Sequence, residues 1–185
     1  MAMRAPPLPR TADELDHTPD DGYRYEIIDG VVLVTPPPPR GHQRLVFLLA
    51  KRLDAFAASH GLEVMIAPID VRASPVTQVE PDLLVLPRHF EGRELTRWEP
   101  MSALVLVVEI LSPSTAHVDR GRKRELYLER GVPEYWIVDE VSGSVALWRP
   151  GAGEARHVRD TLIWTPPGVT ESLDVDLVSI FDDAR

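Results

Sequence analysis

The 185-residue sequence contains no cysteine and only two lysines, against eighteen arginines. Without cysteine there are no disulfides and no thiolate metal ligands, which fits a reducing compartment. The longest uncharged apolar run, Ala103–Val108, is far too short to span a bilayer. The first thirty residues hold no apolar segment typical of a secretory signal peptide. We therefore expect a cytoplasmic protein with no membrane partner.

Length and composition predict one globular domain. Apolar residues make up 44% of the chain, enough for a core of its own. Residues 1–22 contain several prolines and acids, and we expect a flexible or partly helical lead-in there. Residues 23–185 are predicted to form the single domain.

The net charge of −9 is concentrated in two acidic segments. Residues 13–30 carry −6 and residues 171–185 carry −4, which leaves +1 for the rest of the chain. An acidic balance argues against a nucleic-acid partner, but a neutral body can still carry a local basic surface. Alternatively, the acidic ends are simply solvated. The candidates for the basic surface are Arg120, Arg122, Lys123 and Arg124.

The segment Leu104–Asp139 predicts a strand, a helix and a second strand. It begins with an apolar run typical of a strand that is buried on both faces. Helical spacing then extends from Asp119 to Arg130 and ends at Gly131 and Pro133. The second apolar strand covers Tyr135–Val138.

Glu109 lies near the end of the first of these strands. An ionised carboxylate in an apolar strand costs several kcal/mol unless an arginine, a hydrogen-bond network or a metal ion compensates it. One face of the following helix is shared, by three- and four-residue spacing, by Asp119, Lys123, Leu126, Tyr127 and Arg130. Because Leu126 and Tyr127 are expected to be buried, Lys123 is predicted to point inward beside Glu109.

The other predicted elements surround this unit. Asp29-Gly30 is a strong hairpin signal between strands at 23–29 and 31–35, and an apolar stripe predicts a helix from His42 to Ser59. Residues 87–100 are expected to be a loop. Further strands are predicted at 62–72, 83–86, 145–148 and 162–164.

Asp82, Glu109 and Lys123 together offer the groups needed for phosphodiester hydrolysis. Mg²⁺ prefers oxygen ligands, usually one or two carboxylates completed by water and substrate phosphate. The backbone carbonyl of Ile110 is a further candidate ligand. A bound ion can activate water, and a neighbouring lysine can orient or deprotonate that water or stabilise the pentacovalent phosphate.

Six motifs, in order along the chain, resemble those of one bacterial protein family. They are Y-E-I-I-D-G at 25–30, G-H-Q-R at 41–44, P-D-L-L-V at 81–85, V-V-E-I-L-S-P-S-T at 107–115, D-R-G-R-K-R-E-L-Y at 119–127 and G-V-P-E-Y-W-I-V-D at 131–139. On these motifs the sequence resembles the putative restriction endonuclease family, within the PD-(D/E)XK nuclease superfamily. The resemblance spans roughly residues 23–150 and continues more weakly to Ile180.

The resemblance implies an α/β (α+β-like) fold with a restriction-endonuclease-like core. That core is a mixed central β-sheet flanked by helices, with an N-terminal hairpin and C-terminal strands. The resemblance also implies hydrolysis of DNA that depends on Mg²⁺, for which Mn²⁺ is a substitute. A homodimer is expected by analogy only, because many nucleases of the superfamily pair to cut two strands.

Asp82 corresponds to the first acid of the superfamily motif and Glu109 to the second. The superfamily pattern places a lysine two residues after the second acid, but here that position is Leu111. In this family the lysine looks as though it has moved to the next helix, which assigns its role to Lys123. The resemblance therefore implies that Asp82, Glu109 and Lys123 are catalytic, and that the metal ligands are Asp82, Glu109 and the Ile110 carbonyl.

Three further residues match family motifs or lie beside the site, and each has a structural alternative. Glu26, His42 and Asp119 are candidates for supporting the metal ligands. Alternatively, Glu26 is an exposed strand carboxylate, His42 a packed helix residue and Asp119 a helix cap.

The three proposed catalytic residues have structural alternatives too. Asp82 can be a strand-entry residue that hydrogen-bonds a turn, and Glu109 can be half of a buried ion pair with an arginine. Lys123 can extend from a half-buried helix to solvent.

The leading functional hypothesis is a Mg²⁺-dependent DNA endonuclease that uses these residues. The alternative is a catalytically weak nuclease-like fold that acts as a DNA-binding or protein-interaction module, which the acidic balance favours. A third hypothesis is a metal-dependent phosphohydrolase that acts on small nucleotides. Carboxylates in apolar surroundings favour an enzyme, because a scaffold has no need of them.

Overall fold

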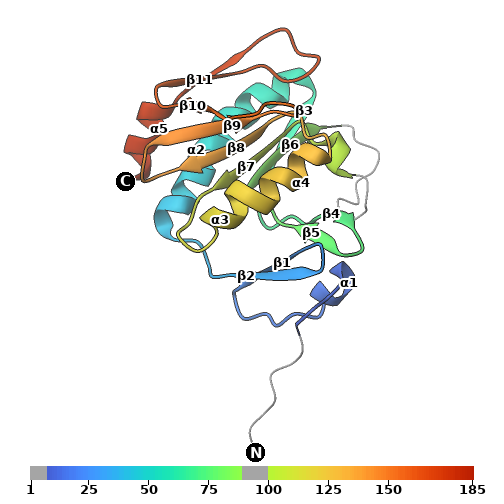
Figure 1. Cartoon of the computed structure of the whole chain (residues 1–185). Coiled ribbons are helices and arrows are strands. Elements are labelled where there is room, and N and C mark those ends of the chain that lie inside the picture. The colour runs from blue at the N-terminus through green and yellow to red at the C-terminus, as the bar shows by residue number, and fades with distance from the viewer. Residues whose placement is uncertain (1–7, 89–99) are drawn as a thin grey trace, which may run out of the picture.

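The structure is a computed structural model that describes residues 8–88 and 100–185 (Figure 1). Most of the loop predicted at 87–100 therefore lies outside the described residues. The observed architecture is the predicted one, a mixed central sheet flanked by helices. Within the described residues, no helix combines the length and apolarity needed to cross a membrane.

The central sheet has six strands in the order β10-β9-β8-β7-β6-β3. β7 and β8 run parallel, and the other neighbouring pairs are antiparallel. β6, β7 and β8 are buried along nearly their whole length, which explains their continuous apolar sequences. The strands are β3 (Leu62–Ile66), β6 (Leu83–Pro87), β7 (Leu106–Ile110), β8 (Tyr135–Asp139), β9 (Ser144–Trp148) and β10 (Arg156–Val158).

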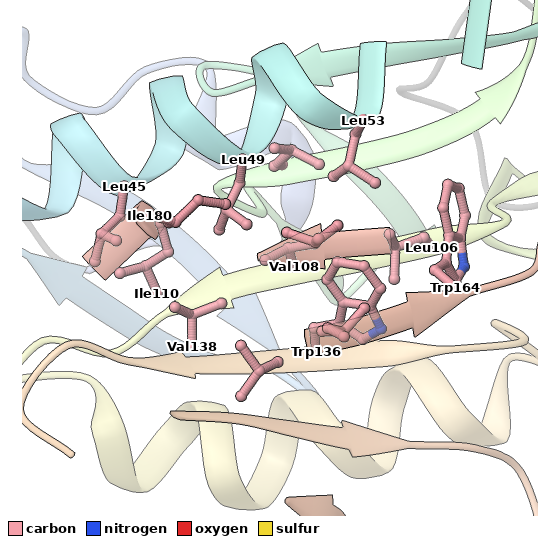
Figure 2. Packing of buried hydrophobic residues seen from close by; sticks show 14 of the residues in the cluster. Leu45, Leu49, Leu53, Leu106, Val108, Ile110, Trp136, Val138, Trp164 and Ile180 are labelled. Carbon is pink, nitrogen blue, oxygen red and sulfur yellow. The ribbon is translucent and has the colours of Figure 1, made fainter. Parts of the chain in front are cut away.

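Helix α2 (Arg40–Ala57) covers one face of this sheet, as the apolar stripe predicted (Figure 2). Its buried Leu45, Leu49 and Leu53 lie on one side of the helix and pack with residues of β7 and β8. Three C-terminal elements extend the same core: β11 (Thr161–Trp164), β12 (Leu173–Asp176) and α5 (Leu177–Ala184). Trp164 of β11 meets Trp136 of β8 edge to face, with ring centroids 5.9 Å apart.

A helical segment between β7 and β8 covers the opposite face. It consists of α3 (Ala116–Val118), a π-helical stretch (Asp119–Lys123) and α4 (Arg124–Glu129). Leu126 and Tyr127 are buried against this face, as predicted. The segment begins three residues before the predicted helix.

A second, four-stranded sheet has the order β2-β1-β5-β4. It contains the predicted hairpin, whose turn residues Asp29 and Gly30 both have positive φ angles, 51° and 75°. Helix α1 (Ala12–Leu15) packs against this hairpin, because Ala12 and Leu15 are buried with Ile27. The domain boundary at residue 22 stays a prediction. The strands are β1 (Arg24–Ile28), β2 (Val31–Thr35), β4 (Val71–Ser74) and β5 (Thr77–Val79).

The prediction of one strand over residues 62–72 was wrong. The chain forms β3 and β4 there, and these strands belong to different sheets. Pro68 lies between them and has no N–H to donate to a strand ladder. The Ala67 N–H donates instead to the carbonyl of Asp82, so this turn is fixed beside the start of β6.

The packing under α2 gives a stability prediction. Leu49 is only 1% exposed, so Leu49→Ala is expected to lower the free energy of unfolding by about 2–5 kcal/mol. Phe47, on the same helix, is 55% exposed, and Phe47→Ala is expected to cost less than about 1 kcal/mol. Urea unfolding measures both changes. Equal losses would contradict the orientation of α2.

Candidate active site

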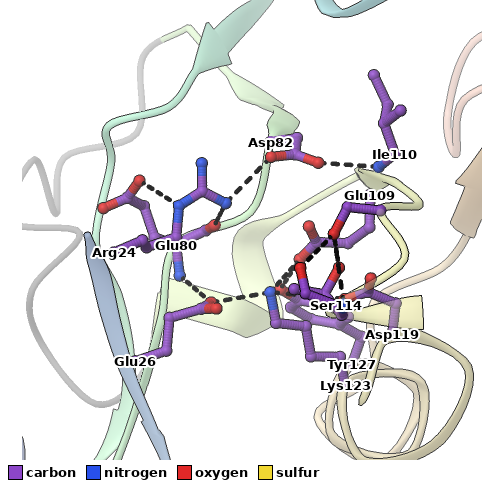
Figure 3. Close-up of polar contacts among 12 residues, drawn as sticks. Arg24, Glu26, Glu80, Asp82, Glu109, Ile110, Ser114, Asp119, Lys123 and Tyr127 are labelled. Atoms are coloured by element: carbon purple, nitrogen blue, oxygen red, sulfur yellow. Dashed lines mark hydrogen bonds and ion pairs between the residues drawn. The ribbon is translucent and has the colours of Figure 1, made fainter. Parts of the chain in front are cut away.

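The predicted site residues meet in one cavity of about 220 Å³ (Figure 3). β1, β2, α2, β7, the helical segment and Asp82, the residue before β6, all contribute to its lining. Each of the predicted side chains is at most 6% exposed. The charged and imidazole side chains that line the cavity are Arg24, Glu26, His42, Asp82, Glu109, Asp119 and Lys123.

Glu109 is compensated by a lysine and a tyrosine. Its Oε1 lies 2.9 Å from Nζ of Lys123 and accepts a hydrogen bond of 3.1 Å from the Tyr127 hydroxyl. Lys123 is 2% exposed, so it does not extend to solvent. The predicted inward orientation of Lys123 is therefore confirmed, and the ion-pair partner of Glu109 is this lysine rather than an arginine.

Three carboxylates surround the Lys123 ammonium group. Nζ lies 2.8 Å from Oε1 of Glu26, 2.9 Å from Glu109 and 3.8 Å from Oδ1 of Asp119. Burial by itself lowers the pKa of Lys123, but the three negative charges outweigh it and raise that pKa above its ordinary value. Lys123 is therefore a permanently charged ammonium group at neutral pH.

Asp82 is held by three donors from three different segments of the chain. Its Oδ2 accepts hydrogen bonds from Nε2 of His42 at 3.0 Å and from the Ile110 N–H at 2.8 Å. Its Oδ1 lies 3.0 Å from Nη1 of Arg24. Burial favours protonation of Asp82, but His42, Arg24 and the Ile110 N–H outweigh it and lower the pKa of Asp82 to about 2. Since Asp82 is ionised, Nε2 of His42 carries the donated proton.

The Arg24 contact with Asp82 belongs to a chain of interactions that includes two residues that the sequence reasoning missed, Arg24 and Glu80. Arg24 bridges Asp82 and Glu80, because its Nε lies 2.8 Å from Oε1 of Glu80. The Glu80 N–H in turn donates to Oε1 of Glu26 at 2.8 Å. Arg24 lies two positions before Glu26 in β1 and thus on the same face of the strand. This spacing is the sequence signal that could have identified Arg24.

Negative charge exceeds positive charge in this site. Five carboxylates, Glu26, Glu80, Asp82, Glu109 and Asp119, face two permanent cations, Arg24 and Lys123. Burial and the neighbouring carboxylates raise the pKa of Glu109 well above its ordinary value. Burial also raises the pKa of Asp119 to about 6. The site therefore favours an additional positive charge, either a proton or a metal cation.

Two buried polar atoms have no hydrogen-bond partner among the described residues, Nδ1 of His42 and Oδ1 of Asp119. Asp119 lies inside the helical segment, four residues after the cap position Thr115, so it does not cap this helix. Glu26 is 2% exposed, so it is not an exposed strand carboxylate. Both structural alternatives were wrong.

The donors fit a hard divalent cation in type and in charge. Mg²⁺ typically takes one or two protein carboxylates and completes its coordination with water and phosphate. Asp82, Glu109 and Oδ1 of Asp119, which accepts no hydrogen bond among the described residues, supply such oxygens. Residues 8–88 and 100–185 contain no group of three or more histidine or carboxylate side chains that is already arranged to hold a metal ion. Any ion would thus depend on water and substrate for much of its coordination.

The mixed central sheet flanked by helices defines a restriction-endonuclease-like fold. The family model of Uma2, putative restriction endonuclease, matches residues 12–177, and the chain belongs to this family. The resemblance seen in the sequence motifs is thereby confirmed.

A solved structure is similar to the whole chain. It is a putative nuclease belonging to DUF820 from Anabaena variabilis ATCC 29413, with a TM-score of 0.76 and 18% identity, and the match covers 96% of this chain and 100% of that one. At this identity the likeness shows the fold alone. No curated protein matches the chain.

The two lysines provide a matched test of the buried charge cluster. Lys123→Met leaves Glu26 and Glu109 buried without their cation, so a loss of about 3–5 kcal/mol in the free energy of unfolding is expected. Lys51 is exposed on α2, and Lys51→Met is expected to cost less than about 0.5 kcal/mol. Chemical denaturation at neutral pH measures both. A small loss for Lys123→Met would show that the cluster is not buried as described.

The raised pKa of Asp119 predicts a pH dependence of stability. The pKa is about 6 in the folded chain and 3.8 ordinarily, so between these values the folded chain binds more protons than the unfolded chain. Stability due to Asp119 is therefore gained as pH falls through 6 and lost as it rises. From about pH 7.5 to about pH 5 this gain amounts to about 1 kcal/mol.

Asp119→Asn is expected to remove this gain, while Asp54→Asn, on the exposed side of α2, is expected to retain it. Urea unfolding at the two pH values gives the comparison. An unchanged pH dependence in Asp119→Asn would refute the assignment.

Proposed function

We propose that the protein is a Mg²⁺-dependent DNA endonuclease whose catalytic residues are Asp82, Glu109 and Lys123. The observation that carries the proposal is the 2.9 Å contact between Lys123 and Glu109 in the cavity that Asp82 also lines. These residues come from the position immediately before β6, from β7 and from the helical segment, so their convergence is a property of the fold. Family membership supports hydrolysis of nucleic acid as the reaction.

The carboxylates of Asp82 and Glu109 and the backbone carbonyl of Ile110 are the proposed ligands of Mg²⁺, or of Mn²⁺ in its place. When bound, the ion would supply an activated water and neutralise negative charge that develops on the phosphate. The charge excess of the site supports this assignment. Burial and the neighbouring carboxylates raise the pKa of Glu109, and a divalent cation would offset both effects.

Lys123 is proposed to stabilise charge rather than to accept a proton. Its raised pKa keeps the ammonium group protonated, and a protonated amine cannot act as a general base. A fixed ammonium group next to the reacting phosphate would instead stabilise the negative charge of the transition state. Glu26 holds Lys123 in place through its 2.8 Å contact.

His42, Arg24 and the Ile110 N–H are proposed to orient Asp82. Their three contacts occupy both carboxylate oxygens and keep Asp82 ionised. Tyr127 supports Glu109 in the same way. Oδ1 of Asp119 has no hydrogen-bond partner among the described residues, and it is proposed to face the bound water or ion.

One observation favours the alternative, a catalytically weak nuclease-like fold that acts as a DNA-binding or protein-interaction module. Asp82 and Glu109 already have protein partners, so these contacts, rather than a metal ion, can compensate their buried charges. Metal binding therefore separates the two functions. Pairing of two chains to cut both DNA strands stays a prediction.

The test compares metal binding and plasmid nicking in one set of variants. Glu109→Gln keeps the side-chain volume but removes a ligand charge, so we expect at least about tenfold weaker Mg²⁺ and Mn²⁺ binding by calorimetry. Metal-dependent nicking should fall about 100-fold or more. Glu129→Ala, an exposed carboxylate of α4, is the control and should keep both properties.

If the wild-type protein binds no divalent ion, even with DNA present, the endonuclease proposal is refuted. The interaction module is then the remaining hypothesis. Nicking that persists in Glu109→Gln would refute the assigned site.

A further inference from the structure

A second cavity, of about 420 Å³, lies beside the candidate active site. Its floor is formed by Ile137 of β8 with Ala146 and Trp148 of β9, side chains that pack on the same side of the sheet as α4. β9 and β10 continue the sheet past the helical segment, which leaves this area uncovered (Figure 1). We call this cavity the arginine groove.

Three arginines and one histidine line the arginine groove. Arg120 and Arg124 line it from the helical segment, and His157 and Arg159 line it from β10 and the residue that follows. Among the described residues that line the groove, one is acidic, Asp139. Its Oδ2 lies 3.1 Å from Nη2 of Arg120. In a chain with a net charge of −9, such a local excess of positive charge is a specific feature.

The geometry of Arg124 suits recognition of a phosphate group. Its guanidinium lies over the ring of Trp148, 4.7 Å from the centroid, and its Nη2 lies 3.0 Å from Oε1 of Glu125, so two contacts position the side chain above the floor. A planar guanidinium donates two parallel hydrogen bonds to phosphate oxygens, and a pre-positioned one loses less entropy on binding. Arg120 is 56% exposed, so it is accessible to a ligand in the groove.

One helical segment serves both cavities. Asp119 and Lys123 line the candidate active site, whereas Arg120 and Arg124, each one residue further along, line the arginine groove. The stretch after β7 separates the two cavities, since Leu111 lines the groove and Ser112 to Thr115 line the active site. A polyanion bound along Arg120 and Arg124 would thus pass next to Asp82 and Glu109.

We propose that the arginine groove binds the phosphate backbone of DNA and holds it beside the active site. The proposal rests on the proposed function for the identity of the ligand as DNA. It also explains how an acidic protein can bind a polyanion, because the groove and the acidic cavity lie on different sides of the same helical segment. The sequence analysis placed Lys123 among the candidates for a basic surface, but Lys123 lines the candidate active site and not the arginine groove.

The experiment measures binding of a short fluorescein-labelled DNA duplex by anisotropy, with EDTA present so that no cleavage occurs. The variant Arg120→Ala/Arg159→Ala removes two exposed groove charges and leaves the Arg124–Trp148 contact intact. Each lost phosphate contact reduces the slope of log affinity against log salt by about 0.9, so two contacts reduce it by about 1.8. Affinity at low salt should fall about tenfold or more.

The matched control is Arg52→Ala/Arg185→Ala, which removes two exposed charges from α2 and the residue after α5, on the other side of the sheet. We expect its affinity to stay within about twofold of wild type and its salt slope to change by less than about 0.9, the value for one phosphate contact. Thermal melting of both double variants checks that the fold is retained. An affinity and slope like those of wild type in the groove variant would overturn the proposal.

Competition identifies the ligand. A matched RNA duplex or a nucleoside triphosphate that displaces the DNA more effectively than unlabelled DNA would overturn the DNA assignment. The two proposals fail separately. Wild-type protein that binds DNA through the groove but shows no metal-dependent nicking refutes the endonuclease alone. Nicking and binding that are both unaffected by Arg120→Ala/Arg159→Ala refute the groove alone.

Discussion

The structure depends on one buried ammonium group shared by three carboxylates. Lys123 lies within 2.9 Å of Glu26 and Glu109 and 3.8 Å from Asp119, so it ties the second sheet, the central sheet and the helical segment together. A charge buried this deeply is tolerated only when its partners are present, and the reverse also holds. The cluster therefore fixes the relative positions of three elements while it leaves the site short of positive charge.

That shortage links stability to chemistry. Burial, together with repulsion between the carboxylates of the site, raises the pKa values of Glu109 and Asp119 and makes a cation favourable there. The π-helical stretch carries both Asp119 and Lys123, and π-helical turns are frequent at functional sites. Its other side presents Arg120 to the arginine groove. One short segment thus separates an acidic cavity from a basic one.

Elements with a clear hydrophobic period were predictable. The apolar stripe correctly predicted α2, and Asp29-Gly30 correctly predicted the hairpin. The continuous apolar runs correctly predicted β6, β7 and β8. The strand predicted over 62–72 was wrong because the pattern of side chains continues across Pro68 although the backbone ladder does not. The short β5, β10 and β12 span too few residues to show a period. Helix α5 was also missed, although Asp176 caps it through the Ser179 N–H.

By itself, the sequence determined which residues carry the candidate chemistry. Glu109 and Lys123 were identifiable because charged side chains stand out in an apolar strand and on a buried helix face, and Asp82 was identifiable from the P-D-L-L-V motif at 81–85. Only the tertiary structure decided their partners. Arg24 and Glu80 come from distant positions, and the Arg124–Trp148 contact joins a helix to a strand. Pairings of this kind depend on how sheets and helices pack, because local periodicity sets which face a side chain occupies but not what lies opposite it.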